Sequence, residues 1–244
     1  MTGNASLFGY LDMVLFGVLP YVAIFTFLVV SIYRYLGLGF TYSSLSSQFL
    51  ENKQHFWGLV PFHYGIITIL AGHVIGFLIP EQVLIWNSAP LRLYILEAAA
   101  FIGGIFTLIG LVNICIRRFT VTKVRMTTTT ADWVVLGILL FSVITGLLTA
   151  IFHQWGSSWF AASMAPYLWS LVKLNPQLGF ITPMPVLVKL HVVGAWIMIL
   201  LFPFTRLVHL LVVPNPYLWR KPQIVRWNWD RRRVRSTDYT SNGR

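Results

Sequence analysis

Five long stretches of apolar residues, separated by shorter polar or basic segments, dominate the pattern along the chain. They run over residues 8–33, 56–79, 91–116, 131–152 and 186–213. A helix rises about 1.5 Å per residue, so each stretch is long enough to cross the ~30 Å hydrocarbon core of a bilayer. The pattern therefore predicts an all-α membrane protein with five transmembrane helices in a bundle.

Two of these stretches contain residues that disturb a regular helix. Asp12 and Pro20 lie near the start of the first, and Pro203 in the fifth removes a backbone hydrogen bond, which predicts a kink. No basic residue precedes the first stretch, which is too long for a cleaved signal peptide, so a retained helix is expected. Residues 154–185 are rich in Trp, Ser and Pro, which predicts an outer loop with a short interfacial helix.

The composition supports a lipid environment. Hydrophobic residues make up 57% of the 244 residues and charged residues only 10%. Soluble domains have roughly 45–50% apolar and about 25% charged residues, so this chain has too few charges to cover a water-exposed surface. The single cysteine, Cys115, excludes an internal disulfide framework and a thiolate-ligated metal cluster.

Basic residues are distributed unequally between the two sides of the predicted bundle. If the N-terminus lies outside, the inner segments hold 14 of the 18 Lys and Arg residues, and the outer segments hold only Arg92, Lys173 and Lys189. The positive-inside rule therefore predicts a cytoplasmic C-terminus, and the net charge of +11 reflects topology rather than nucleic-acid binding. We expect a transmembrane domain over 1–213 and a basic cytoplasmic tail over 214–244 that binds anionic lipid or docks a partner.

Four of the six histidines lie inside the predicted spans, where polar side chains are costly and usually functional. His63 and His73 are in the second span, and His191 and His209 are in the fifth. The two spans run in opposite directions, so side by side they would pair His63 with His209 near the inner face and His73 with His191 near the outer face. His55 and His153, at span ends, have an ordinary interfacial interpretation.

Several kinds of site fit two such pairs. Zinc usually takes three or four ligands, and haem takes one axial ligand on each face, which two facing helices can supply. The pattern favours bis-histidine haem, while a proton or ion relay and purely structural, hydrogen-bonded histidines stay open. Glycines near the histidines either give clearance to a flat macrocycle or pack helix on helix; they are Gly65, Gly72, Gly76 and Gly194. The few carboxylates of the spans have cap or interface interpretations; they are Asp12, Glu97 and Asp132.

The spacing of the histidines poses a geometric problem for two straight helices. Ten residues separate His63 from His73, a rise of ~15 Å, whereas eighteen separate His191 from His209, a rise of ~27 Å. We expect helix tilt and the kink at Pro203 to absorb the difference.

At these residues the chain resembles the gamma subunit of respiratory nitrate reductase, a membrane dihaem cytochrome b. The resemblance extends to about Trp227, and its stretches are "LFGVLPYVA", "SSQFLENK", "FHYGIITILAGHVIGFLIP", "KVRMTTTTADW" and "KLHVVGAWIMILLFPFTRLVHLLVVPNPYLWRKPQIVR". It implies two haems b, with His73 and His191 as axial ligands near the outer face and His63 and His209 near the inner face. It also implies residence in the cytoplasmic (inner) membrane of a prokaryote.

The resemblance further implies that quinol is oxidised near the outer haem and that electrons pass through the inner haem to an iron–sulfur beta subunit. An alpha subunit with a molybdenum cofactor then reduces nitrate. The expected quinol site involves Gly72, His73 and a basic residue after the second span; residues 81–96 diverge from the family, and Arg92 is the only basic residue there. Arg206, three residues before His209, is a candidate partner for an inner haem propionate.

Alternatives remain open at this point. Residues 228–244 have no counterpart in the family and could contact a different partner. The same conduit could serve another oxidoreductase or run in reverse, as in the membrane subunit of a nitrite-oxidising complex. A histidine-relay transporter or proton channel is the alternative from a different class.

Overall fold

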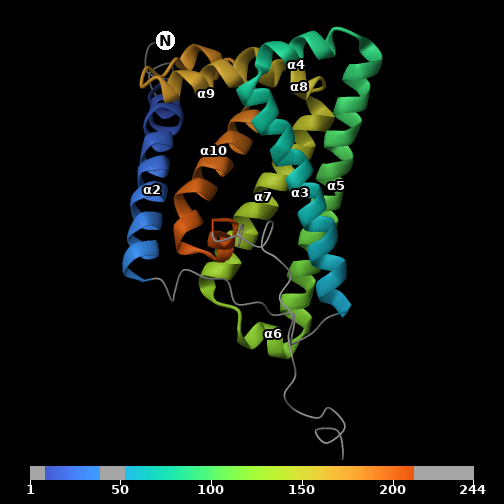
Figure 1. The fold of residues 1–244 in the computed structure, drawn as a ribbon, viewed down its shortest axis with the longest axis vertical. Helices are drawn as coiled ribbons and strands as arrows, with labels where there is room; N and C mark the ends of the chain where they lie inside the picture. The colour runs from blue at the N-terminus through green and yellow to red at the C-terminus, as the bar shows by residue number, and fades with distance from the viewer. Residues whose placement is uncertain (1–8, 39–52, 212–244) are drawn as a thin grey trace, which may run out of the picture. The chain divides into compact units, whose positions relative to one another are not determined.

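The computed structural model describes residues 9–38 and 53–211, and these residues form helices and no strand. Five helices are long and apolar enough to cross a membrane, over Gly9–Gly37, Phe56–Leu78, Pro90–Thr120, Thr130–Phe152 and Val186–Phe204. The sequence prediction of five spans is therefore confirmed, and Figure 1 shows them as one bundle. The expected tail at 214–244, including 228–244, lies outside the described residues.

The spans begin and end at local signals in the sequence. The first begins with helical residues 9–12 and continues through a π-helical turn, η1 (Met13–Val18), into α2 (Leu19–Gly37), with Pro20 in the first turn of α2. The next are α3 (Lys53–Leu78) and α5 (Pro90–Thr120), which also begins with a proline. A capping box of Thr129 and Asp132 starts α7 (Thr130–Phe152), because each side chain accepts from the other's backbone N–H.

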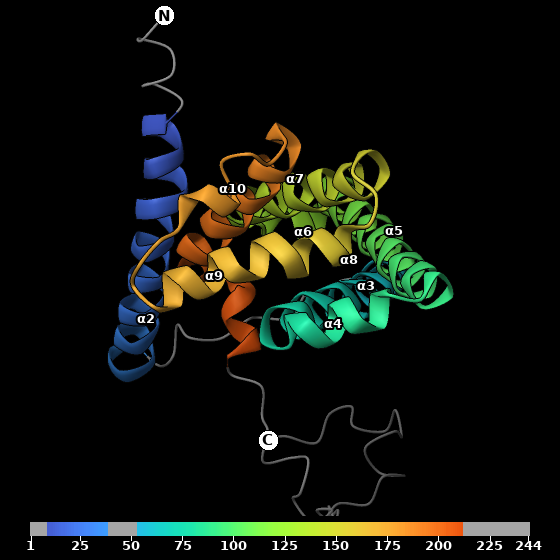
Figure 2. The ribbon, with the colours of Figure 1, turned by 90° about the horizontal axis from the view of Figure 1, so that it is seen from above.

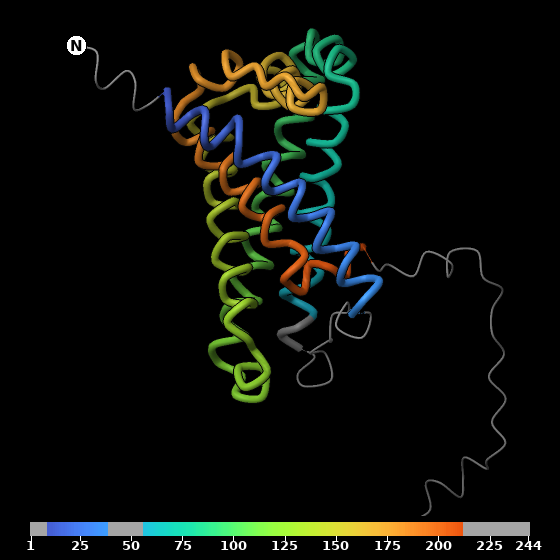
Figure 3. Tube along the Cα trace, turned by 90° about the vertical axis from the view of Figure 1, so that its left-hand side faces the viewer, coloured from blue at the N-terminus to red at the C-terminus, as the bar shows by residue number. Residues whose placement is uncertain are grey.

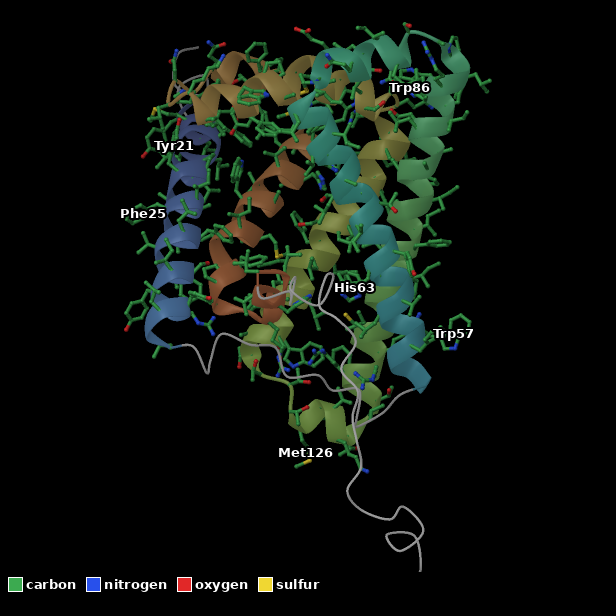
Figure 4. The ribbon with its side chains drawn as sticks, in the orientation of Figure 1. Tyr21, Phe25, Trp57, His63, Trp86 and Met126 are labelled. Carbon is green, nitrogen blue, oxygen red and sulfur yellow. The ribbon has the colours of Figure 1, made fainter. Side chains whose placement is uncertain are left out.

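Large apolar side chains cover the outer surfaces of these helices. Phe25 on α2 is 68% exposed and Trp57 on α3 is 69% exposed, and Figure 4 shows both pointing away from the bundle. An exposed apolar surface this extensive is not stable in water, so it is the surface expected to face lipid.

Helices α3 and α5 lie side by side and approach closely through glycines (Figure 1). A Cβ added to Gly65 of α3 would lie 2.5 Å from the carbonyl oxygen of Gly103 and 2.6 Å from the backbone nitrogen of Thr107, both on α5. On α5, a Cβ at Gly110 would collide with the backbone of Phe62. Small residues at both faces therefore allow the two backbones to touch, as is common between membrane helices.

Short helices cross one end of the bundle. They are α4 (Pro80–Asn87), α8 (Gly156–Trp159), the π-helical turn η3 (Phe160–Met164), α9 (Ala165–Val172) and the 3-10 turn η4 (Leu178–Phe180). Figure 2, which looks down on this end, shows α8 and α9 running across the bundle. We call α8, η3 and α9 the cap; they occupy the segment where the sequence predicted an interfacial helix.

Hydrogen bonds fasten the cap to the spans beneath it. The fully buried Tyr167 donates from its hydroxyl to the carbonyl of Phe16 in η1, at 2.7 Å. Burial raises the pKa of Tyr167, so its phenol keeps the proton that this bond requires. Trp169 donates from its indole nitrogen to the carbonyl of Phe77 in α3, at 2.8 Å, and stacks on the Phe77 ring. The cap is therefore fixed to both the first span and α3.

The fifth span differs from the kinked but continuous helix that the sequence predicted. Helix α10 (Val186–Leu201) ends before Pro203 and is followed by two 3-10 segments, η5 (Phe202–Phe204) and η6 (Arg206–Leu210). Thr205 between them is extended, with a ψ of 175°, and Arg34 of α2 donates to the carbonyl of Pro203. Figure 3 shows the chain leaving the helical path at this point, beside the end of the first span.

Candidate functional site

The structure brings the four histidines of the spans together in two pairs. The ring centroids of His63 and His209 are 6.3 Å apart, with an angle of 64° between the ring planes. Those of His73 and His191 are also 6.3 Å apart, with an angle of 41°. Figure 4 shows His63 pointing from α3 into the bundle. These are the two layers that antiparallel helices were expected to form.

The distance between the rings separates two interpretations of each pair. A direct N–H···N hydrogen bond between two imidazoles would place their centroids about 5 Å apart. A metal ion held by both rings, about 2 Å from each nitrogen, would place them about 6 Å apart. The observed 6.3 Å therefore fits two axial ligands of one metal better than a hydrogen-bonded pair.

Each of the four imidazoles is oriented by a backbone carbonyl that accepts from its Nδ1. The acceptors are Leu59 for His63 at 2.8 Å, Ile69 for His73 at 2.8 Å, Ser142 for His191 at 3.0 Å and Arg206 for His209 at 2.7 Å. A carbonyl can only accept, so Nδ1 carries the proton and Nε2 keeps its lone pair. This is the tautomer and orientation that metal-ligating histidines usually have.

The break after Leu201 resolves the mismatch between the ten- and eighteen-residue spacings. His191 lies on the regular helix α10, whereas His209 lies on η6, beyond the extended residue Thr205. The rise of ~1.5 Å per residue assumed for a continuous helix therefore does not apply between them. Both rings consequently reach partners on the single helix α3, which has a described course from Lys53 to Leu78.

Of the glycines that the sequence singled out, three pack against other elements. Gly65 contacts α5, as described above, a Cβ at Gly76 would lie 2.9 Å from the ring of Phe160 in η3, and one at Gly194 would lie 2.9 Å from Oγ of Ser142 in α7. A Cβ added to Gly72, next to His73, would have nothing within 4 Å beyond its chain neighbours and the backbone of its own helix. Only Gly72 therefore leaves open space for another molecule.

Helix α7 and the cap contribute residues that the sequence interpretation missed. Ser142 and Thr145 of α7 both lie within hydrogen-bond distance of His191 Nδ1, and a Cβ at Gly146 would meet the His191 ring at 2.9 Å. Phe160 in η3 presents its ring to that of His73, edge to face, at 5.3 Å. The only sequence signal of the α7 residues was the recurrence of small and hydroxyl residues along 142–149.

The carboxylates of the spans all have protein partners. Asp12 pairs with Lys189 at 2.8 Å, and Glu97 accepts from the backbone and hydroxyl of Ser157. Asp132, which caps α7 as the sequence suggested, also pairs with Arg206. Among the described residues, no group of three or more His, Cys, Asp or Glu side chains is placed to hold a metal ion.

The two basic residues expected at the ends of the conduit have contacts that were not anticipated. The Nε of Arg206 lies 2.7 Å from Asp132, and its Nη2 donates to the carbonyl of Thr127 at 3.2 Å. A propionate role for Arg206 stays a prediction.

Arg92 lies over the Trp86 ring at 5.2 Å and donates to the carbonyl of Ile85 at 3.4 Å. Within the described part of the chain, these contacts of Arg92 lie at the α4–α5 corner, and none is with Gly72 or His73.

Comparison with known proteins gives consistent matches over most of the chain. The model of a family described as nitrate reductase gamma subunit matches residues 12–228. The nitrate reductase gamma chain of Bacillus subtilis is 32% identical over 217 residues, which cover 87% of this chain and 97% of that protein. The respiratory nitrate reductase 1 gamma chain of Escherichia coli is 34% identical over 222 residues, or 89% and 98%. A nitrate reductase-like protein of Mycobacterium tuberculosis, NarX, is 31% identical over 224 residues, which make up 32% of its length.

Proposed function

Because the chain belongs to the nitrate reductase gamma subunit family, whose members are membrane cytochrome b anchors of nitrate reductase, we propose that it is a dihaem b electron conduit. His73 and His191 would hold an outer haem, and His63 and His209 an inner haem. The conduit would oxidise quinol near the outer face and deliver electrons to an iron–sulfur beta subunit, which serves a molybdenum-containing alpha subunit that reduces nitrate.

The observation that carries this proposal is the geometry of the four imidazoles. Every Nδ1 is hydrogen-bonded to a backbone carbonyl, which leaves the lone pair of every Nε2 available, and the paired rings lie 6.3 Å apart between their centroids. Two neutral imidazoles at this spacing are a donor set that haem iron accepts. When bound, haem supplies one-electron redox chemistry, and the protein sets its potential through the axial ligands, burial and nearby hydrogen bonds.

The distribution of charge supports the proposed direction across the membrane. The helix α6 (Thr122–Met126), which carries Lys123 and Arg125, lies at the end of the bundle opposite α4 (Figure 1). Arg117 and Arg118, at the end of α5, precede it. We propose that this end is cytoplasmic and that the N-terminus is outside. The protein would then reside in the cytoplasmic (inner) membrane of a prokaryote.

Quinol oxidation on the outer side has a simple charge balance. Each quinol gives a quinone, two electrons and two protons; the protons would leave to the outside and the electrons would move inward. Charge is thereby separated across the membrane without any proton being carried through the protein. Gly72, which leaves open space beside His73, and Arg92 remain the residues that we propose for quinol binding.

The same hydrogen bonds argue against a proton relay through the histidines. A relay requires each imidazole to pass a proton from one ring nitrogen to the other, but a backbone carbonyl at Nδ1 cannot accept and release that proton. In addition, the carboxylates Asp12, Glu97 and Asp132 are engaged by Lys189, Ser157 and Arg206.

Electron flow in the reverse direction, toward quinone as in nitrite oxidation, uses the same geometry and stays the second candidate.

A reduced-minus-oxidised spectrum of the purified holo-complex tests the proposal. We expect a b-type α band and two haems per chain by pyridine haemochrome assay, titrating in two steps because the two layers have different surroundings. The variant His153→Ala is the matched control, since the ring of His153 is outside both pairs, and it should retain both haems. A protein that is correctly inserted in the membrane but contains no haem would rule the proposal out.

The quinol role of Arg92 predicts a kinetic effect of its substitution. Arg92→Ala should raise the Michaelis constant for a water-soluble quinol analogue roughly 10- to 100-fold, because loss of a hydrogen bond from a charged group costs roughly 1.5–3 kcal/mol. Lys173→Ala, which removes a basic residue at the end of α9, is the control and should leave it unchanged. If both variants behave like the wild type, Arg92 only fastens the corner between α4 and α5.

A further inference from the structure

The segment that carries His209 has little structure of its own to hold it. The five residues of η6 (Arg206–Leu210) follow the extended Thr205, whose side chain accepts from the backbone nitrogen of Leu207 at 3.3 Å. A single 3-10 turn has few internal hydrogen bonds and is only marginally stable alone. The orientation of His209 must therefore depend on contacts with another element.

Asp132 of α7 supplies such a contact. Its Oδ1 lies 2.7 Å from Nε of Arg206, the first residue of η6, and the Asp132 side chain is only 5% exposed. Its other oxygen accepts from the backbone nitrogen and the hydroxyl of Thr129, at 2.9 Å and 3.1 Å. The carboxylate is thus fixed at the first turn of α7, and although the Arg206 side chain is 34% exposed, the buried carboxylate makes the ion pair less screened than one between two exposed groups.

Arg206 connects this carboxylate to the histidine. Its side chain is held by Asp132, while its backbone carbonyl accepts from Nδ1 of His209 at 2.7 Å. One residue therefore fixes η6 to α7 and also sets the direction of the imidazole. We propose that Asp132 is a positioning residue for the inner axial ligand: it holds Arg206 so that the carbonyl of Arg206 aims Nε2 of His209 at His63.

The outer layer has an ion pair of similar length that is connected differently. Asp12 of the first span pairs with Lys189 at 2.8 Å, two residues before His191. However, Nδ1 of His191 bonds to the carbonyl of Ser142 on α7 and not to that of Lys189. His191 also lies within the regular helix α10. The Asp12–Lys189 pair therefore does not control the direction of its ligand, and Asp12→Asn is a matched control for loss of an ion pair at a histidine layer.

The inference rests on the proposed function, and its test separates the two. The variant Asp132→Asn keeps an oxygen that can cap α7 but loses the charge that holds Arg206. In the purified holo-complex, we expect the low-spin electron paramagnetic resonance signal of the inner haem to shift, and the apparent affinity of that site for haem to fall about 10- to 100-fold. The outer signal should stay unchanged, and Asp132→Glu should restore part of the inner signal.

A measurement that does not involve haem gives a second readout. Amide hydrogen exchange of peptides covering 205–211, measured on haem-depleted membranes, should be faster in Asp132→Asn than in the wild type and unchanged in Asp12→Asn. If Asp132→Asn does not accumulate, Arg206→Lys keeps the positive charge but not the geometry of the guanidinium, and it should shift the inner signal in the same way. If these variants bind both haems as the wild type does and the signal of the inner haem is unaltered, the positioning role is refuted. If the wild-type protein itself contains no haem, the proposed function is refuted instead.

Discussion

Replacing His209 by alanine is expected to remove the same b-type haem that is lost from His63→Ala, and to leave the other in place. The ring centroids of these two residues are 6.3 Å apart, and each lies on one side of the proposed inner haem. An iron that loses one of two axial imidazoles becomes high-spin or dissociates. By the same geometry, His73→Ala and His191→Ala should both remove the outer haem.

Two measurements on the purified complex distinguish these losses. Haem content per chain should fall by about half in each variant, because one of two sites is lost. Redox titration followed by electron paramagnetic resonance should then show which signal is missing. The pairing requires the same missing signal in His63→Ala and His209→Ala, and the other signal in His73→Ala and His191→Ala. If His63→Ala and His73→Ala instead removed the same signal, the two-layer arrangement would be wrong.

The second large effect is expected from Gly65→Val in the contact between α3 and α5. The new side chain would meet backbone atoms of Gly103 and Thr107 at 2.5–2.6 Å, and neither atom can move without its helix. Overpacking of this kind typically costs about 1–3 kcal/mol, and here it would also displace the helix that carries His63 and His73. We expect a lower midpoint of unfolding in detergent and a reduced content of both haems.

Gly137→Val is the control for this substitution. It introduces the same side chain into the membrane helix α7, but a Cβ at Gly137 would have nothing within 4 Å beyond its chain neighbours and the backbone of its own helix. A substitution without steric conflict usually changes the free energy of unfolding by less than about 0.5 kcal/mol. Equal midpoints for Gly65→Val and Gly137→Val would show that α3 and α5 can separate without cost.

The sequence alone predicted those parts of the architecture that depend on residue type and period. Five apolar stretches predicted five spans, and the opposite directions of the second and fifth spans predicted which histidines meet. Both follow from helix geometry and the thickness of a bilayer, which are general. The capping role of Asp132 was also predictable, because a Thr followed three residues later by an acidic residue is a recognisable helix start.

The details that orient the histidines were not predictable from the sequence. Backbone carbonyls of Leu59, Ile69, Ser142 and Arg206 accept from the rings, and a carbonyl has no signature in the residue type. Pro203 indicated a disturbance, but a proline can kink a helix or end it, and contacts with Thr205 and Arg34 decide which occurs. The contact of Arg206 with Asp132 was not predictable either, because Asp132 lies on another helix.

Each histidine pair joins the second span to the fifth, and this has a consequence for the order of events during synthesis. His63 and His73 leave the ribosome early, together on one helix, while His191 and His209 follow only after two further spans and the cap have been made. Neither pair can close around a ligand until the last span has inserted. A nascent chain stopped after α7 would therefore hold half of each pair and complete neither, so under the proposed function haem capture would be a late step that reports on completed insertion.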